Sequence, residues 1–296
     1  MFDLQSFYEA KDAKDAVRAL VENPNAEIIS GGTDVLIRMR EGKDAGRGLV
    51  SIKNIEALKG VKMLSNGDIL IGAGTAFTHI TNDPIIEEHL PMLGEAVDQV
   101  GGPQIRNMGT IGGNVCNGAT SADSAASVMA LEAEVQLLGP DGERTVPIDE
   151  FYTGPGRTVR DRCEVCTGIL VRRESYEGWF GKYFKYGKRR AMEIATLGCA
   201  VRLRLSGDRK TIEDVRLAYG VAAPTPIRCR RAEESLRGAA VGDDSAVERF
   251  AALALEEVKP RSSWRASKEF RIQLIGELAK RGVYEAERLA GVESGV

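Results

Sequence analysis

Two short loops in this sequence combine paired glycines with hydroxyl and amide side chains. Residues 30–33 read Ser-Gly-Gly-Thr, and residues 109–114 read Gly-Thr-Ile-Gly-Gly-Asn. Paired glycines let the backbone adopt positive φ angles and approach a ligand closely, while the neighbouring side chains supply polar contacts. Successive backbone amides in such turns form a concave anion site, which is strengthened where a helix begins. We therefore expect the two loops to bind the two phosphates of a diphosphate, the alternative being that each glycine pair is only a tight turn.

A third glycine-rich stretch does not qualify as a dinucleotide-binding motif. Residues 72–77 read Gly-Ala-Gly-Thr-Ala-Phe, so phenylalanine stands where the motif requires its last glycine, and no βαβ unit with a trailing acidic residue follows cleanly. The sequence also lacks the GxxxxGK[ST] pattern that binds nucleotide phosphates in a P-loop. A Rossmann site and a P-loop are both disfavoured.

The cysteines and histidines give little sign of a metal or nucleophilic centre. Cys163 and Cys166 form a lone CxxC with no second pair at metal-ligand spacing, so we expect buried or edge thiols and keep a metal or redox role as the alternative. His79 and His89 fall on a predicted helix, far from any nucleophile. Five cysteines in so long a chain do not indicate a disulfide framework, and we expect free thiols.

The composition is that of a globular protein without a strong charge bias. Of the 296 residues, 43% are hydrophobic and 28% are charged, and the formal net charge is −3. A chain of this length buries roughly 75% of its unfolded surface and is expected to divide into two or three lobes. Neither a basic field for nucleic acid nor a membrane-spanning apolar run is present, and the first residues do not resemble a secretory signal. We expect a cytoplasmic protein that binds neither nucleic acid nor membrane.

The loops need strands and helices to hold them, and the hydrophobic periodicity predicts these in three regions. In the first region, helical patterns at 12–23 and 34–42 alternate with short apolar runs at 26–30 and 48–52. This alternation indicates a small αβαβ lobe. The first glycine loop connects its first apolar run to its second helix.

The second region contains the second glycine loop. Residues 68–74 read as a strand, and residues 78–101 read as two short helices around Pro91. Residues 132–148 read as a hairpin that turns at Asp141-Gly142.

The third region combines strands with long helices. Strand-like runs cover 183–187, 196–206 and 213–223, and the apolar spacing of amphipathic helices follows at 243–258 and 267–291. The end of the chain is therefore predicted to be a sheet covered by helices.

Several segments carry a resemblance to a known family. They read GGTDVLI, GPQIRNMGTIGGNVCNGATSADSA, FKYGKR, VAAPTPIR and PRSSWRASKEFR. Together they resemble the FAD-binding (medium) subunit of molybdenum hydroxylases, most closely that of the bacterial xanthine dehydrogenase type. The resemblance covers nearly the whole chain, and the order and separation of the two glycine loops are its most specific features.

The resemblance implies an α+β fold. A two-lobed FAD-binding domain of the vanillyl-alcohol-oxidase (PCMH) type would occupy residues 1–176, with lobes of about 1–58 and 59–176. A domain with an antiparallel sheet and a helix bundle, of the type found at the C-terminus of the CO dehydrogenase flavoprotein, would occupy residues 177–296.

The same resemblance implies the residues of a cofactor site but no catalytic residue and no metal ligand. Asp123 matches an acidic residue directed at the cofactor's sugar or ribityl hydroxyls, with a solvated helix N-cap as the alternative. Lys185 matches a lysine that contacts FAD, and Ile169 falls in a strand that passes the flavin edge. The implied FAD-binding residues are Glu27, Ile28, Ile29, Ser30, Gly31, Gly32, Thr33, Asp34, Gly109, Thr110, Ile111, Gly112, Gly113, Asn114, Asp123, Ile169 and Lys185.

The function implied by the resemblance is electron transfer within a larger enzyme. A large partner subunit would carry the molybdenum cofactor and a small one the two-iron clusters, in a heterotrimer or a dimer of heterotrimers. Electrons from xanthine would reach noncovalently held FAD in this chain and pass to NAD. The chain itself has neither a molybdenum-cofactor signature nor the cysteine set of a plant-type iron–sulfur protein.

Other functions stay open at this point. The same subunit could serve a hydroxylase for nicotinate, CO, another N-heterocycle or an aldehyde. A stand-alone flavin oxidase of the vanillyl-alcohol type would need its own base over the flavin, and no such residue is identified. A purely structural subunit would not be expected to keep both glycine loops. The sequence has no cysteine-rich insertion for a four-iron cluster, which disfavours the reduction of aromatic thioesters.

Overall fold

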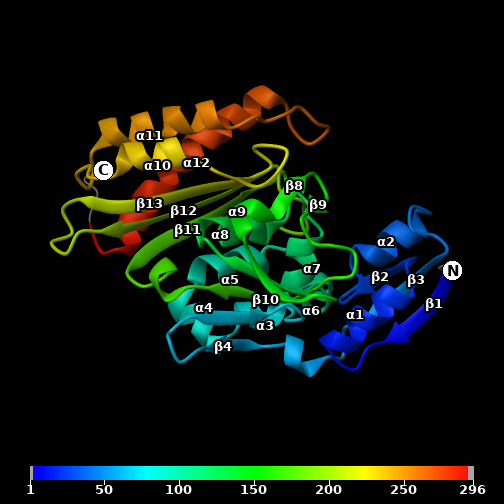
Figure 1. The fold of residues 1–296 in the computed structure, drawn as a ribbon. Coiled ribbons are helices and arrows are strands. Elements are labelled where there is room, and N and C mark those ends of the chain that lie inside the picture. The colour runs from blue at the N-terminus through cyan, green and yellow to red at the C-terminus, as the bar shows by residue number, and fades with distance from the viewer. Residues whose placement is uncertain (1–2, 293–296) are drawn as a thin grey trace.

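The computed structural model describes residues 3–292, whose elements form three neighbouring groups (Figure 1). The first group is a parallel sheet in the order β1-β3-β2. Its elements are β1 (Leu4–Glu9), α1 (Ala13–Glu22), β2 (Ala26–Ile29), α2 (Val35–Arg40) and β3 (Arg47–Ser51). The predicted αβαβ pattern is confirmed, but the structure adds β1 in front of it. That strand escaped prediction because all its residues are exposed, so no apolar alternation marks it.

The second group is an antiparallel five-stranded sheet in the order β4-β5-β10-β6-β7, flanked by short helices. Its strands are β4 (Val61–Met63), β5 (Ile69–Gly72), β6 (Glu134–Gly139), β7 (Gly142–Pro147) and β10 (Val165–Val171). The predicted hairpin is confirmed, since β6 and β7 pair from Glu134 with Pro147 to Gly139 with Gly142. The helices are α3 (Phe77–Thr81), α4 (Pro84–His89), α5 (Pro91–Asp98), α6 (Pro103–Met108), α7 (Ile111–Cys116), α8 (Asp123–Ala130) and α9 (Ile148–Phe151).

The two short helices predicted around Pro91 are confirmed as α4 and α5, but the structure adds α3 before them within residues 77–98. The additional break lies at Asp83, whose side chain accepts a hydrogen bond from the Ile85 amide. Pro84 follows as the first helical residue, a position where its missing N–H costs nothing. An aspartate cap followed by proline therefore starts α4 immediately after α3 ends.

The third group is an antiparallel four-stranded sheet in the order β11-β12-β13-β14 with helices on both faces. In Figure 1, α10, α11 and α12 lie on one side of this sheet, while α5 and α8 of the second group pack on the other face. Of the first three, α10 and α12 contact the strands, and α11 packs on these two helices. The predicted strands and long helices are confirmed, and the short helix α10 is an addition. The elements are β11 (Trp179–Tyr186), β12 (Leu197–Leu205), β13 (Ile212–Gly220), β14 (Ile227–Arg228), α10 (Arg230–Leu236), α11 (Asp244–Glu257) and α12 (Lys268–Leu289).

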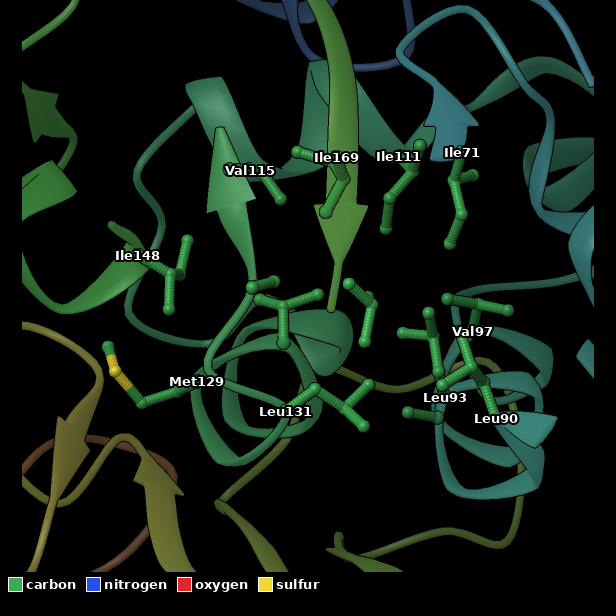
Figure 2. Packing of buried hydrophobic residues seen from close by; sticks show 14 of the residues in the cluster. Ile71, Leu90, Leu93, Val97, Ile111, Val115, Met129, Leu131, Ile148 and Ile169 are labelled. Atoms are coloured by element: carbon green, nitrogen blue, oxygen red, sulfur yellow. The ribbon is translucent and has the colours of Figure 1, made fainter. Parts of the chain in front are cut away.

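Smaller elements complete the chain between these groups. They are the 3-10 helices Glu56–Leu58 and Arg173–Ser175 and the two-stranded sheet of β8 (Tyr152–Gly154) and β9 (Arg157–Thr158). Each large sheet has its own hydrophobic core. Figure 2 shows the core of the second group, where side chains from strands, such as Ile71 and Ile169, and from helices, such as Leu93 and Val97, point into a common interior.

Candidate functional site

Both glycine loops line one cavity of about 900 Å³ between the first and second groups of elements. This volume lies near the upper end of the roughly 300–1,000 Å³ typical of small-molecule sites. Thirteen of the residues predicted to bind a cofactor line it: Glu27, Ile28, Ser30, Gly31, Gly32, Thr33, Asp34, Gly109, Thr110, Gly112, Gly113, Asn114 and Asp123.

The first loop connects β2 to α2 and presents free backbone donors. Gly32 has a φ of 73°, which favours glycine. Within residues 3–292, the backbone amides of Gly31 through Asp34 have no hydrogen-bond partner in the protein, although they line the cavity. Unpaired amides that converge on a cavity are what an anionic group requires. This loop therefore has the properties of a phosphate-binding site.

The second loop is built differently, because most of its amides bond within the protein. The Ile111 amide donates to the Thr75 carbonyl and the Gly112 amide to the Ala73 carbonyl. Thr110 caps α7 by accepting the Gly113 amide on its hydroxyl at 3.2 Å. The loop therefore offers the cavity polar side chains and a glycine surface rather than a nest of amides.

One glycine of each loop allows a close backbone approach that a side chain would prevent. A Cβ atom on Gly31 would lie 1.8 Å from the Met108 carbonyl oxygen, which no side chain can tolerate. A Cβ atom on Gly112 would lie 2.5 Å from the Cβ of Ala73. The Thr110 hydroxyl also donates to the Ser30 hydroxyl at 3.4 Å. Gly31 thus serves close packing between the first and second groups of elements, whereas Gly112 serves close packing within the second group.

A buried carboxylate stands at another wall of the cavity. Asp123, the first residue of α8, accepts hydrogen bonds from the Lys185 ammonium at 2.8 Å and from the Tyr183 hydroxyl at 3.1 Å. Lys185 also donates to the Gln99 carbonyl at 2.7 Å. Burial raises the pKa of Asp123, and Lys185 and Tyr183 act against this rise. The alternative of a solvated N-cap was wrong, because Asp123 is only 6% exposed and Ala122 occupies the cap position.

Four predicted residues do not line the cavity. Ile111 and Ile169 are fully buried in the hydrophobic core of the second group, as Figure 2 shows. Ile29 ends β2 just before the first loop, and Lys185 reaches the cavity only through Asp123. Their effect on a bound molecule would act through the residues that they support.

Sequence reasoning missed an arginine that joins the walls of the cavity. Arg38 on α2 donates to Glu27 at 2.6 Å, to Asp44 at 2.6 Å and to Asn117 at 3.2 Å. All four residues line the cavity. The position of Arg38 on the helix after the first glycine loop was visible in the sequence, but no local pattern indicated its three partners.

A second missed feature is the segment between β11 and β12. Met192 and Ile194 line the cavity although they are 63% and 48% exposed. Met192 also has a positive φ of 54°, which is uncommon for a residue other than glycine. This segment therefore lies at the open side of the cavity.

Three further features of residues 3–292 bear on the candidate chemistry. All five cysteines are free thiols. Within residues 3–292, no group of three or more His, Cys, Asp and Glu side chains is arranged to hold a metal ion. No helix in this part of the chain is long and apolar enough to cross a membrane.

Two family models match the chain. Residues 2–171 match the FAD-binding domain in molybdopterin dehydrogenase, and residues 182–286 match the CO dehydrogenase flavoprotein C-terminal domain. The first of these segments contains both glycine loops and the cavity carboxylate Asp123.

Individual proteins match over almost their full lengths. The chain is 43% identical over 291 residues to the xanthine dehydrogenase FAD-binding subunit of Escherichia coli O157:H7, which covers 98% of this chain and 99% of that protein. It is 31% identical over 281 residues to the carbon monoxide dehydrogenase medium chain of Hydrogenophaga pseudoflava, covering 95% and 96%. A solved structure of carbon monoxide dehydrogenase from the same organism superposes with a TM-score of 0.90 at 32% identity, covering 97% of this chain and 98% of that one.

Proposed function

The chain belongs to the FAD-binding medium subunits of the molybdenum hydroxylase family, and we propose that it is the electron-transfer subunit of a xanthine dehydrogenase. Noncovalently bound FAD would occupy the cavity between the glycine loops. Electrons would arrive from iron–sulfur clusters of a small partner subunit, after oxidation of xanthine at molybdenum in a large one, and would leave to NAD.

The free amides of the first loop are the observation that carries this proposal. FAD contains a pyrophosphate, which needs hydrogen-bond donors, and the Gly31 through Asp34 amides are unpaired donors at the cavity wall. FAD also carries sugar and ribityl hydroxyls, which need acceptors. An ionised carboxylate offers about four acceptor positions, and Asp123 uses two of them on Lys185 and Tyr183. The residues present therefore suit both kinds of group.

The roles of the remaining residues follow from their contacts. Arg38 fixes Glu27, Asp44 and Asn117 in place, so the part of the cavity they form is ordered before binding. Thr110 and Asn114 of the second loop present a hydroxyl and an amide from the opposite lobe. Met192 and Ile194, which line the open side, would cover part of the bound FAD. Bound FAD supplies the ability to accept electrons singly and to release two together.

The xanthine type is proposed because a xanthine dehydrogenase subunit is 43% identical to this chain over nearly its whole length. Related medium chains of carbon monoxide and nicotinate enzymes are 31% and 30% identical. The substrate is oxidised in a different chain, so the residues of this cavity do not choose it. We further propose assembly as a heterotrimer or a dimer of heterotrimers in the cytoplasm.

A purified complex of this chain with its molybdenum and iron–sulfur partners tests the proposal. We expect xanthine to reduce NAD, whereas nicotinate or carbon monoxide in the same assay would leave NAD oxidised. A complex that oxidises xanthine with dyes or ferredoxin but never reduces NAD would contradict the acceptor. A complex that reduces NAD with another donor but not with xanthine would contradict the substrate. The mass of the complex decides between the two assemblies.

A further inference from the structure

Two thiols at the wall of the cavity have no part in the proposed electron transfer. Cys116 is the last residue of α7, and Cys166 is the second residue of β10. Helix α7 packs against β10, and both cysteines line the cavity. The side chain of Cys116 packs against the hydrophobic core that contains Cys166.

Cys166 shares a hydrophobic core with Cys116 rather than with Cys163, the other cysteine of the CxxC motif. Cys163 lies against the hydrophobic core of the first group of elements, whereas Cys166 belongs to the core of the second group. The register of β10 against β6 shifts between Cys166 and Gly168, and the Cys166 sulfur lies 3.8 Å from the Gly168 carbonyl oxygen at this irregularity. The Cys116 and Cys166 thiols lie close enough for each to shift the pKa of the other.

The surroundings make the two thiols unequal. The Cys166 thiol lowers the pKa of Cys116, burial opposes this, and the Arg160 guanidinium lowers it further. Contact with Cys116 and burial raise the pKa of Cys166. The Tyr152 hydroxyl is buried without a hydrogen-bond partner among residues 3–292. Burial raises its pKa, and Cys116 and Cys166 raise it further. Cys116 is partly exposed whereas Cys166 is buried, so a small oxidant in the cavity reaches Cys116 first. Cys116 is therefore placed as the attacking cysteine and Cys166 as the resolving one.

We propose that Cys116 and Cys166 are a redox-active pair that closes to an intramolecular disulfide when the protein meets a peroxide. The Cys116 thiolate attacks one oxygen of hydrogen peroxide, the O–O bond breaks, and the products are Cys116 sulfenic acid and hydroxide. The Cys166 sulfur then attacks the sulfenic sulfur, an S–S bond forms, and its proton and the hydroxyl leave as water. Two thiols are oxidised and one peroxide is reduced to two waters.

The disulfide would tie α7, which carries the second glycine loop, to the central strand of the neighbouring sheet. This inference does not depend on the identity of the electron acceptor or of the oxidised substrate. It also separates the two cysteines of the CxxC motif, because Cys166 takes part in the disulfide and Cys163 does not.

Peptide mapping by mass spectrometry tests the pair on the purified full chain. After complete reduction and treatment with one equivalent of hydrogen peroxide, we expect the peptides containing Cys116 and Cys166 to be joined, with the loss of two hydrogen atoms. Cys163→Ser should keep this cross-link, whereas Cys116→Ser and Cys166→Ser should lose it. A link between Cys163 and Cys166, or oxidation of either residue without any cross-link to the other, would overturn the proposal. Because the wild-type map decides the pairing, the test stands even if one of the serine variants fails to fold.

Discussion

At the scale of single residues, the site depends on a carboxylate that the fold keeps out of water. The exposed fractions of the Asp123 and Lys185 side chains are 7% and 9%, so their ion pair is largely desolvated. Such pairs add little net stability, but losing one partner is costly because the other charge stays buried. Asp123 therefore fits a binding role better than a stabilising one.

Replacing Asp123 with asparagine should weaken FAD binding by about tenfold to a hundredfold. Hydrogen bonds to charged groups contribute roughly 1.5–3 kcal/mol, and about 1.4 kcal/mol corresponds to tenfold in affinity. Titration of the FAD-free variant with FAD, followed by flavin fluorescence, measures the change. Glu95→Gln is the matched control. Glu95 forms an ion pair at 2.6 Å with Lys182, which lies on the same strand as Lys185, but Glu95 does not line the cavity. Equal affinities of the two variants would contradict the role of Asp123.

At the scale of elements, the position of α7 depends on Gly112, which has no side chain. Gly112 lies against Ala73 of the neighbouring loop, and its amide donates to the Ala73 carbonyl. The glycine-rich Gly-Ala-Gly stretch at 72–74 is thus a packing surface for α7. This agrees with its rejection as a dinucleotide motif.

Gly112→Ala should destabilise the protein and displace the second glycine loop. A Cβ atom there would lie 2.5 Å from the Ala73 Cβ and 2.8 Å from its carbonyl oxygen, so the backbone must move. Overpacking of this kind costs roughly 1–3 kcal/mol. Gly113→Ala is the control, because the new Cβ would meet only the Thr110 hydroxyl at 3.0 Å. Urea unfolding of both variants should show the larger loss of unfolding free energy for Gly112→Ala, and the reverse order would contradict this packing.

The sequence predicted most of the elements that carry apolar periodicity, and it identified both glycine loops. It missed β1, which is exposed along its length, and the boundary between α3 and α4, which depends on a capping aspartate. It treated the two loops as equivalent, although within residues 3–292 only the first has a run of four successive free amides. That difference arises from long-range bonds to Thr75 and Ala73. The partners of Arg38 were hidden for the same reason, since Asn117 is remote in sequence.

At the scale of the whole molecule, α8 links the cavity to the third group of elements. Asp123 begins this helix at the cavity, and Glu132 follows its end with a positive φ of 52°. The Glu132 carboxylate accepts hydrogen bonds from Arg228 at 2.5 Å, Arg216 at 2.9 Å and Arg202 at 3.3 Å. These arginines come from three strands of the sheet that α8 covers.

Glu132→Gln should lower the free energy of unfolding by roughly 3 kcal/mol at neutral pH, because three largely buried guanidinium groups lose their shared anion. Burial raises the pKa of Glu132, but Arg228 and Arg216 outweigh it and hold the pKa below its ordinary value of 4.5. The folded state therefore binds this proton less readily than the unfolded state. The contribution of Glu132 to stability is present above the ordinary pKa and disappears as the pH falls below it.

Urea unfolding at neutral pH and at an acidic pH well below 4.5, the ordinary pKa of Glu132, checks this expectation. The difference between wild type and Glu132→Gln should shrink at the lower pH. Glu256→Gln serves as the control, because its pair with Arg231 is exposed and contributes about 0–1 kcal/mol. A pH-independent difference for Glu132→Gln would contradict the ion-pair explanation.

We propose that this chain binds FAD noncovalently between its two glycine loops. An absorption spectrum of the purified chain, taken before and after acid release and followed by identification of the released flavin, tests this binding. We expect one equivalent of FAD per chain, released by acid and distinct from FMN. A colourless chain that also fails to bind added FAD would contradict the account, and the free amides of Gly31 through Asp34 would then need another ligand.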